Sequence, residues 1–253
     1  MKTYPSDLTD NQWQVIKDLV DNNRKRRHSM RKIVDAILYI TKSGCQWRML
    51  PLEYAPWQTV YYYFRQWKLN GLIEEIHDYL VNKVRLKKGK RPVPTVGIID
   101  SQSTKTINVC QDNIGYDGGK KIKGRKRHII VDTLGLILAI VVHSATEHDS
   151  KSAERVFKNL KDRYLSGIVK IFADAGYRGE LIEKARRQFG LILEIVKRNE
   201  AGMFKILPKR WVVERTFAWI SFQRRTSKDY ERLTETSVAI IQLSMIRVML
   251  NKF

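Results

Sequence analysis

Three acidic residues have the type and placement to form a catalytic site. Asp100 follows a short apolar run, residues 96–99, which predicts a buried strand, and Asp174 follows a similar run, residues 169–173. Glu214 lies near the start of a helical pattern further along the chain. If the two strands are parallel neighbours, both aspartates lie at one sheet edge, within reach of Glu214. An oxygen-only set of this kind suits Mg²⁺, or Mn²⁺ in its place.

A strand-end aspartate such as Asp100 also has an ordinary structural explanation, because aspartate is a favoured turn residue. Nearby groups could compete for the same role. Asp132 lies in a predicted tight turn and Asp149 in a predicted helix cap, which would explain both without a metal. The other candidates lie after the third predicted strand, where structural or solvated histidines are expected: His143, Glu147 and His148.

The elements that must position the acids alternate between strand and helix after an initial hairpin. This order predicts an α/β domain with a mixed five-stranded sheet and helices on both faces. The hairpin turn is Asp132-Thr133-Leu134-Gly135, which has glycine where a positive φ is favoured. Strands are predicted at residues 96–99, 127–131, 136–142, 169–173 and 191–196, and helices at 149–165, 180–188, beyond 208 and at 234–251.

Residues 1–86 contain four helical patterns and predict a separate all-α domain that resembles a helix-turn-helix bundle. The third pattern, residues 57–68, is a candidate for contact with a DNA groove because Arg65 and Lys68 lie among its aromatic residues. A plain helical bundle whose aromatic residues form the core is the alternative. Residues 87–94 are basic and contain two prolines, which predicts a linker to a second domain at residues 95–253.

The charge of the chain indicates a polyanionic partner. Lysine and arginine number 47 against 26 acidic residues, which gives a net charge of +21 spread along the sequence. A glycine-bearing basic segment follows the first strand, and it is either a phosphate-binding loop or merely a solvated one. Its cations are Lys120, Lys121, Lys123, Arg125, Lys126 and Arg127.

Other features exclude several classes of protein. No apolar run is long enough to span a membrane, and no signal peptide is recognised, so we expect a cytoplasmic protein without membrane contact. Cys45 and Cys110 lack the spacing of a zinc site or a disulfide framework and are expected to be ordinary reduced thiols.

Four motifs, taken together, resemble the bacterial insertion-sequence transposases of the DDE class, specifically the insertion-sequence-five family. The likeness covers nearly the whole chain and implies a ribonuclease H-like catalytic fold. It also implies that double-stranded DNA, both transposon ends and target, is the partner. The motifs are DSQSTKT at 100–106, GYDGGKKIKGRKRHIIVDTLG at 115–135, ADAGYRG at 173–179 and RWVVERTF at 210–217.

The resemblance assigns roles residue by residue. It makes Asp100, Asp174 and Glu214 the ligands of two Mg²⁺ ions, which activate water and then a freed 3′-hydroxyl. Arg210 matches an arginine of the family signature that helps to hold DNA. The signature's tyrosine and lysine are replaced by Leu207 and Ser221. The remaining predicted DNA contacts are Arg178 and Arg215, near two of the acids, and Arg224, Arg225 and Lys228, which could substitute for the lysine.

Two other functions remain open from the sequence. The chain could be a catalytically silent DNA-binding regulator derived from a transposase, or a stand-alone metal-dependent nuclease. The acidic triad argues against the regulator, because a protein that only binds DNA has no reason to gather acids. A homodimer or a larger assembly on DNA is expected, since two DNA ends must be joined together.

Overall fold

The amino-terminal part of the chain is helical, as its apolar stripes predict. In α1 (Asp10–Val20) the Thr9 hydroxyl accepts from the Gln12 backbone N–H at 3.1 Å, and the Gln12 side chain accepts from Thr9 N–H at the same distance. Ser29 caps α2 (Met30–Ser43). The other helices here are η1 (Trp47–Met49), α3 (Trp57–Leu69) and α4 (Leu72–Lys87). This computed structural model describes residues 4–21, 24–107, 112–164, 167–196 and 210–253.

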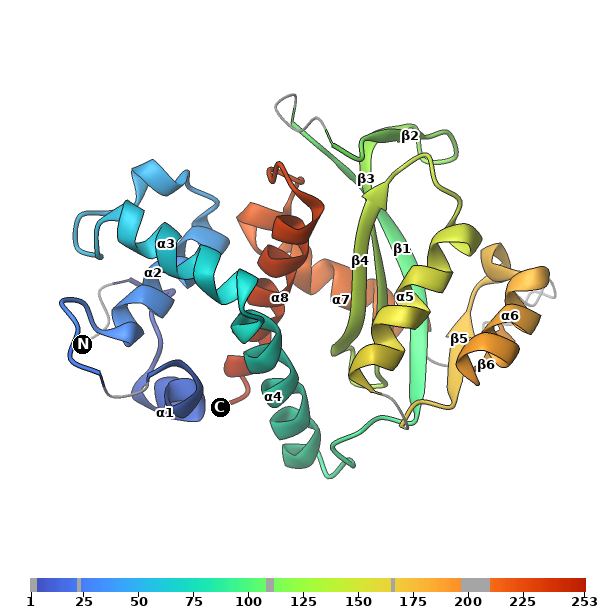
Figure 1. Cartoon of the computed structure of the whole chain (residues 1–253), viewed down its shortest axis with the longest axis horizontal. Coiled ribbons are helices and arrows are strands. Elements are labelled where there is room, and N and C mark those ends of the chain that lie inside the picture. The colour runs from blue at the N-terminus through green and yellow to red at the C-terminus, as the bar shows by residue number, and fades with distance from the viewer. Residues whose placement is uncertain (1–3, 22–23, 108–111, 165–166, 197–209) are drawn as a thin grey trace.

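A mixed sheet forms the second part of the chain, and the predicted fold class is confirmed (Figure 1). The order is β2-β3-β1-β5-β6, with β4 paired to β3. β3 pairs in the antiparallel sense with β1, β2 and β4. The pairings of β1 with β5 and of β5 with β6 are parallel. The strands are β1 (Val96–Lys105), β2 (Gly115–Asp117), β3 (Ile122–Val131), β4 (Ile137–Ser144), β5 (Lys170–Ala173) and β6 (Ile192–Ile195).

Helices cover both faces of this sheet, as expected. The helices α5 (Asp149–Arg163) and α6 (Glu180–Phe189) pack on one face, and α7 (Arg210–Ser221) and α8 (Thr234–Leu250) pack on the other (Figure 1). Short 3₁₀ turns follow β5 and α7, namely η2 (Ala175–Tyr177) and η3 (Arg224–Thr226). The buried apolar side chains of all these layers form one continuous core.

The sheet differs from the prediction in the length of its first strand. β1 continues past Asp100 to Lys105, because the long β3 pairs with it as far as Gly124. Much of the segment predicted to be a basic loop is therefore strand. The segment also contains the short strand β2, which has no apolar pattern from which it could be predicted. A Cβ atom on Gly124 would lie 2.0 Å from the Thr104 carbonyl oxygen, so this glycine is required by strand packing rather than by a phosphate.

The helical part and the sheet part are joined through α8. This helix packs against α2 and α4 as well as against β4 and α7. A buried ion pair also links Arg85 of α4 to Asp132 in the turn between β3 and β4. Within the described residues, the longest apolar helices still fall short of what crossing a bilayer requires.

Candidate active site

Asp100 and Asp174 lie at the same level of two neighbouring strands. The parallel pairing of β1 and β5 sets Ile98 opposite Phe172. Continuing this register by two residues sets Asp100 opposite Asp174, which follows β5 directly. Neighbouring strands lie about 4.8 Å apart, so the two carboxylates belong to one local site. The expectation that the first and fourth predicted strands are parallel neighbours is thus confirmed.

Local hydrogen bonds orient both carboxylates. Asp100 Oδ1 accepts from the backbone N–H of Ser101 at 2.7 Å. Asp174 caps the 3₁₀ turn η2, where its Oδ1 accepts from the N–H of Gly176 at 2.8 Å. Each side chain is partly exposed, which leaves the edge accessible to a ligand from solvent.

Glu214 lies on the exposed face of α7, the helix that packs against β1 and β3. The side chain is not gathered with the two aspartates: within the described residues, no three histidine, cysteine, aspartate or glutamate side chains form a group that could hold a metal ion. The structure therefore brings two of the three predicted acids to one place. The third is on a neighbouring element.

The next residue, Arg215, is held by aromatic rings. Its guanidinium lies 4.5 Å from the centre of the Trp211 ring and 4.6 Å from that of Trp219, and it donates to the carbonyl of Leu134 at 2.9 Å. These contacts fasten α7 to the turn between β3 and β4. Thr216 adds a second bond to the same turn, 2.8 Å from the carbonyl of Gly135.

A buried tyrosine follows Asp174 in the same turn. The hydroxyl of Tyr177 is 2.8 Å from Nε2 of His128, and both side chains are almost fully buried. Burial, and then the carboxylates of Asp100, Asp149 and Asp174, raise the pKa of Tyr177 well above its ordinary value. Asp100, Asp149 and Asp174 thus all act on the pKa of this one hydroxyl.

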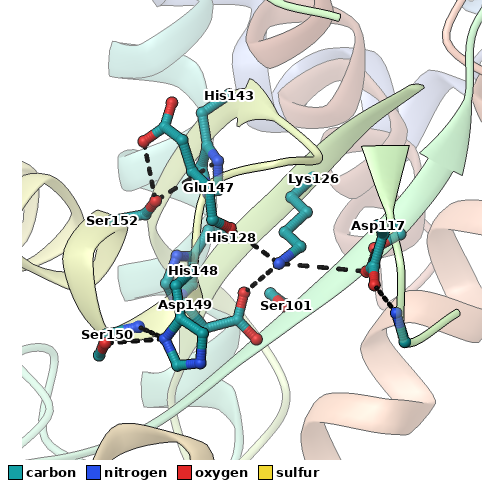
Figure 2. A network of polar contacts seen from close by, with 12 residues as sticks. Ser101, Asp117, Lys126, His128, His143, Glu147, His148, Asp149, Ser150 and Ser152 are labelled. Atoms are coloured by element: carbon teal, nitrogen blue, oxygen red, sulfur yellow. Dashed lines mark hydrogen bonds and ion pairs between the residues drawn. The ribbon is translucent and has the colours of Figure 1, made fainter. Parts of the chain in front are cut away.

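Asp149 belongs to a polar cluster on the α5 side of the sheet (Figure 2). Lys126 Nζ donates to Asp149 Oδ1 at 2.9 Å and to the carbonyl of Glu147 at 2.8 Å, and it lies 4.0 Å from Asp117. Burial acts to raise the pKa of Asp149, but the hydrogen bond and charge of Lys126 outweigh it and hold the pKa below its ordinary value. Asp149 is thus an ion-paired partner of a lysine.

The competing residues have structural partners too. Asp132 accepts from the N–H groups of Leu134 and Leu136 at 2.9 and 2.8 Å, as its predicted turn requires. Glu147 forms an ion pair with Arg155. His148, rather than Asp149, is the N-cap of α5, and its Nδ1 accepts from the N–H of Ser150 at 3.4 Å.

Three of the predicted DNA contacts are buried rather than exposed. Arg125 has no exposed surface; its guanidinium donates to Asp229 Oδ2 at 3.3 Å and to the carbonyls of Glu231 and Arg232 at 2.8 and 2.7 Å. Arg127 is also buried and donates to the carbonyl of Thr226 at 2.7 Å. Both arginines tie β3 to the segment after α7, so they are not surface cations available to a phosphate. Lys126 is buried in the cluster described above.

The other predicted cations divide by exposure. Lys68 donates to the Thr236 hydroxyl at 3.1 Å, and Arg225 pairs with Glu231 at 2.7 Å, so each has a partner within the chain. The side chain of Arg210, together with Leu207 and Cys110, lies outside the described residues. The exposed cations are Arg65, Lys120, Lys121, Lys123, Arg178, Arg224 and Lys228.

Sequence reasoning assigned no role to Tyr177 or His128, although both lie inside the motifs that carry the family resemblance. The available signal was a polar histidine within the apolar strand pattern 127–131, and a tyrosine three residues after Asp174. Neither pattern shows that the two side chains meet, because they come from elements that are 49 residues apart.

Comparison with known proteins identifies relatives of both parts of the chain. Residues 8–77 match the family described as "Putative transposase of IS4/5 family", and residues 91–249 match the family "Transposase DDE domain". A "Putative transposase for insertion sequence element IS402" from Burkholderia cepacia is 31% identical over 126 residues, which is 47% of this chain and 60% of that protein. The "Uncharacterized protein y4sN" from Sinorhizobium fredii is 29% identical over 84 residues, which is 32% of this chain and 67% of that protein.

Proposed function

This chain belongs to the DDE transposases of the IS4/5 family, and on that premise we propose that it binds the ends of an insertion sequence, cleaves the DNA there and joins the 3′ ends to target DNA. The observation that supports the proposal is the parallel pairing of β1 with β5, because continuing its register by two residues past the last pair brings Asp100 and Asp174 to one sheet edge. Two partly exposed carboxylates at one sheet edge of a strongly basic protein could hold metal ions that assist the cleavage of a phosphodiester.

The donor set at this edge fits a hard divalent cation. Carboxylate oxygens are the ligands that Mg²⁺ and Mn²⁺ prefer, and a cation would offset the repulsion between Asp100 and Asp174. These two residues would hold a pair of Mg²⁺ ions, with Glu214 of α7 as the third ligand and Mn²⁺ as a substitute metal. When bound, such ions activate a water molecule and stabilise the leaving oxygen of a phosphodiester.

Exposed cations near the two aspartates would bind the DNA backbone. Arg178 follows the turn that carries Asp174, and Lys120 reaches β1, where its Nζ lies 3.3 Å from the carbonyl oxygen of Ser101. Both could neutralise phosphates next to the scissile bond. Arg65 on the exposed face of α3 would contact DNA further away. We propose that the protein acts in the bacterial cytoplasm, at the nucleoid.

In the proposed reaction, water attacks the phosphorus at the end of the element, and the bond from phosphorus to the 3′ oxygen breaks. The products are a 3′-hydroxyl and a 5′-phosphate. That 3′-hydroxyl then attacks a phosphodiester of the target, forming one new bond and releasing one 3′-hydroxyl of the target strand. Because two ends must be joined together, we propose that a dimer or larger assembly acts on the DNA.

The substitution Asp100→Asn tests the proposal. It removes one negative oxygen donor while keeping the size of the side chain, so we expect Mg²⁺-dependent cleavage of a labelled transposon-end oligonucleotide to be lost. Binding of the same oligonucleotide should be nearly unchanged. The matched control is Asp162→Asn, an exposed residue of α5, which should cleave like the wild type. Continued cleavage by the Asp100 variant would show that the acidic assignment is wrong.

The same assay separates the two alternative functions. Wild-type protein that binds the ends but neither cuts nor joins them with Mg²⁺ or Mn²⁺ would be a catalytically silent regulator. Wild-type protein that cuts the ends but never joins the 3′ ends to a second duplex would be a nuclease.

A further inference from the structure

We propose that Tyr177 is a positioning residue of the active site: by bonding to His128, it holds the turn that carries Asp174 against the strand that carries Asp100. This inference rests on the proposed function, because it concerns the same pair of carboxylates. It assigns a role to a buried contact that does not itself touch metal or DNA.

The first support is that strand pairing alone does not hold Asp174. The ladder between β1 and β5 ends at Ile98 and Phe172, so Asp174 lies beyond it. β5 has only four residues, and its other neighbour, β6, lies on the side of β5 away from β1. Pairing with β6 therefore does not fix Asp174 relative to Asp100. A separate contact is needed to fix the distance between Asp174 and β1.

The second support is the closed turn that joins Asp174 to Tyr177. The N–H of Tyr177 donates to the carbonyl of Asp174 at 3.2 Å, and the N–H of Gly176 donates to the carboxylate at 2.8 Å. Fixing the tyrosine ring therefore also fixes the aspartate. The ring is 1% exposed, so it cannot swing away without opening the core.

The third support is the position of the bonding partner. His128 lies on β3 directly opposite Ser101, the residue that follows Asp100. The bond from Tyr177 to His128 at 2.8 Å thus bridges from the Asp174 turn to the pair of strands that contains Asp100. It crosses the gap that the ladder leaves open.

The bond is also uncharged under working conditions. Burial, together with the charge of neighbouring His143, lowers the pKa of His128 to about 3, so the imidazole is neutral and its Nε2 can accept from the Tyr177 hydroxyl. Two carboxylates on adjacent strands repel each other when no cation is bound. A neutral bond opposes their separation in that state, which would reduce the reorganisation that metal binding requires.

The test is the substitution Tyr177→Phe, which removes only the hydroxyl. Two quantities are to be measured. The first is the affinity of the full chain for Mn²⁺ without DNA, from the electron paramagnetic resonance signal of free Mn²⁺. The second is the Mg²⁺ concentration that gives half-maximal end cleavage. Substitution of a residue that supports metal ligands typically lowers metal affinity 10- to 100-fold. We therefore expect the Mn²⁺ affinity to fall about 10-fold and the Mg²⁺ concentration for half-maximal cleavage to rise about 10-fold. Cleavage at saturating metal should recover most of the wild-type rate.

Tyr54→Phe is the matched control, because it removes another buried tyrosine hydroxyl, which donates to Asp7 at 2.6 Å among the amino-terminal helices. It should leave Mn²⁺ affinity unchanged. A second pair of variants tests the partner. His128→Gln can keep a polar atom near the Nε2 position and should bind Mn²⁺ more tightly than His128→Asn, whose shorter amide cannot reach the tyrosine.

The outcomes separate this inference from the proposed function. If Asp100→Asn binds Mn²⁺ as tightly as the wild type, the metal site itself is wrong. If Asp100→Asn loses the metal but Tyr177→Phe titrates like the wild type, the site stands and the positioning role is overturned. Should Tyr177→Phe fail to fold, equal Mn²⁺ affinities of the two His128 variants would overturn it instead.

Discussion

Arg125 has a different role in the structure from the one that its sequence context predicts. In the sequence it is one of six cations in a glycine-bearing basic segment, and phosphate contact is the natural interpretation. In the fold its guanidinium is fully buried and bonded to Asp229 and to backbone carbonyls beyond α7. The planar fork of arginine suits such a set of acceptors, which a lysine could not satisfy.

We therefore predict opposite effects for two neighbouring cations. Arg125→Met should lower the free energy of unfolding by about 3 kcal/mol, because it removes one partner of a buried ion pair. Lys123→Met, on an exposed side chain of the same strand, should change stability by less than about 0.5 kcal/mol while weakening DNA binding. Urea unfolding and fluorescence anisotropy with a duplex measure the two effects. A stable Arg125→Met protein with weak DNA binding would reverse our assignment.

At the scale of elements, the helices were predictable because each carries its own signals. The capping box at Thr9, the Ser29 cap and the glycine end of α2 all lie within a few residues of the helix that they bound. The same holds for the turn between β3 and β4. Local chemistry of this kind can be recognised without knowing the rest of the fold.

The extent of β1 was not predictable for the opposite reason. Residues 101–105 are all polar, and they form a strand only because β3 supplies a partner along their whole length. The bond between Tyr177 and His128, and the ion pair of Arg125 with Asp229, likewise depend on segments 49 and 104 residues apart. The two aspartates of the candidate site could be selected from the sequence, but the buried contacts around them could not.

Asp35 gives a pH-dependent prediction for the contact between two elements. This α2 residue is 3% exposed, and its Oδ1 accepts from the N–H of Leu8 at 2.8 Å, which ties the segment before α1 to α2. Burial raises its pKa from 3.8 to about 6, and the carboxylate of Asp7 adds to the rise, while the bond from Leu8 acts against it. The folded protein therefore binds this proton more tightly than the unfolded chain does.

The sign follows from that difference in proton affinity. The free energy of unfolding that comes from proton binding by Asp35 is present in full below about pH 4 and is lost as the pH rises through 6. The pKa is raised by roughly two units, so this loss is about 3 kcal/mol. Asp35→Asn removes this titration. The unfolding free energy of the variant minus that of the wild type should therefore increase by about 3 kcal/mol between pH 3 and pH 7 in urea titrations. A difference that is constant with pH would contradict the prediction.

At the scale of the whole molecule, the helical part and the sheet part are fastened together by ion pairs. Arg163 of α5 pairs with Asp78 and, at 3.3 Å, with Glu74, both on α4. Arg85 pairs with Asp132 and also donates to the carbonyl of Arg91, within the predicted linker, at 2.8 Å. The division at residues 87–94 stays a prediction, but a division there would run through an extensive contact surface.

The net charge of +21 leads to a prediction for DNA binding as a whole. A protein that contacts six to ten phosphates loses about 10³- to 10⁵-fold in affinity between 50 and 200 mM salt, and we expect a loss in this range. Lys121→Ala should reduce the slope of log affinity against log salt by about 0.9. Lys184→Ala, which removes an exposed lysine of α6 paired with Glu154, should leave the slope unchanged. Anisotropy titrations at several salt concentrations measure these slopes.

The position of α8 has a consequence for how the protein is made. Its Leu243 and Ile246 line a small apolar cavity together with Ile16 of α1 and Ile37 of α2, and Gln12 bonds to the carbonyl of Leu250 across 238 residues of sequence. On the ribosome, the first helices therefore emerge long before the helix that completes their core. Their apolar faces therefore stay exposed until α8 has been synthesised. A nascent chain stopped before residue 234 would thus lack a completed amino-terminal core as well as α8.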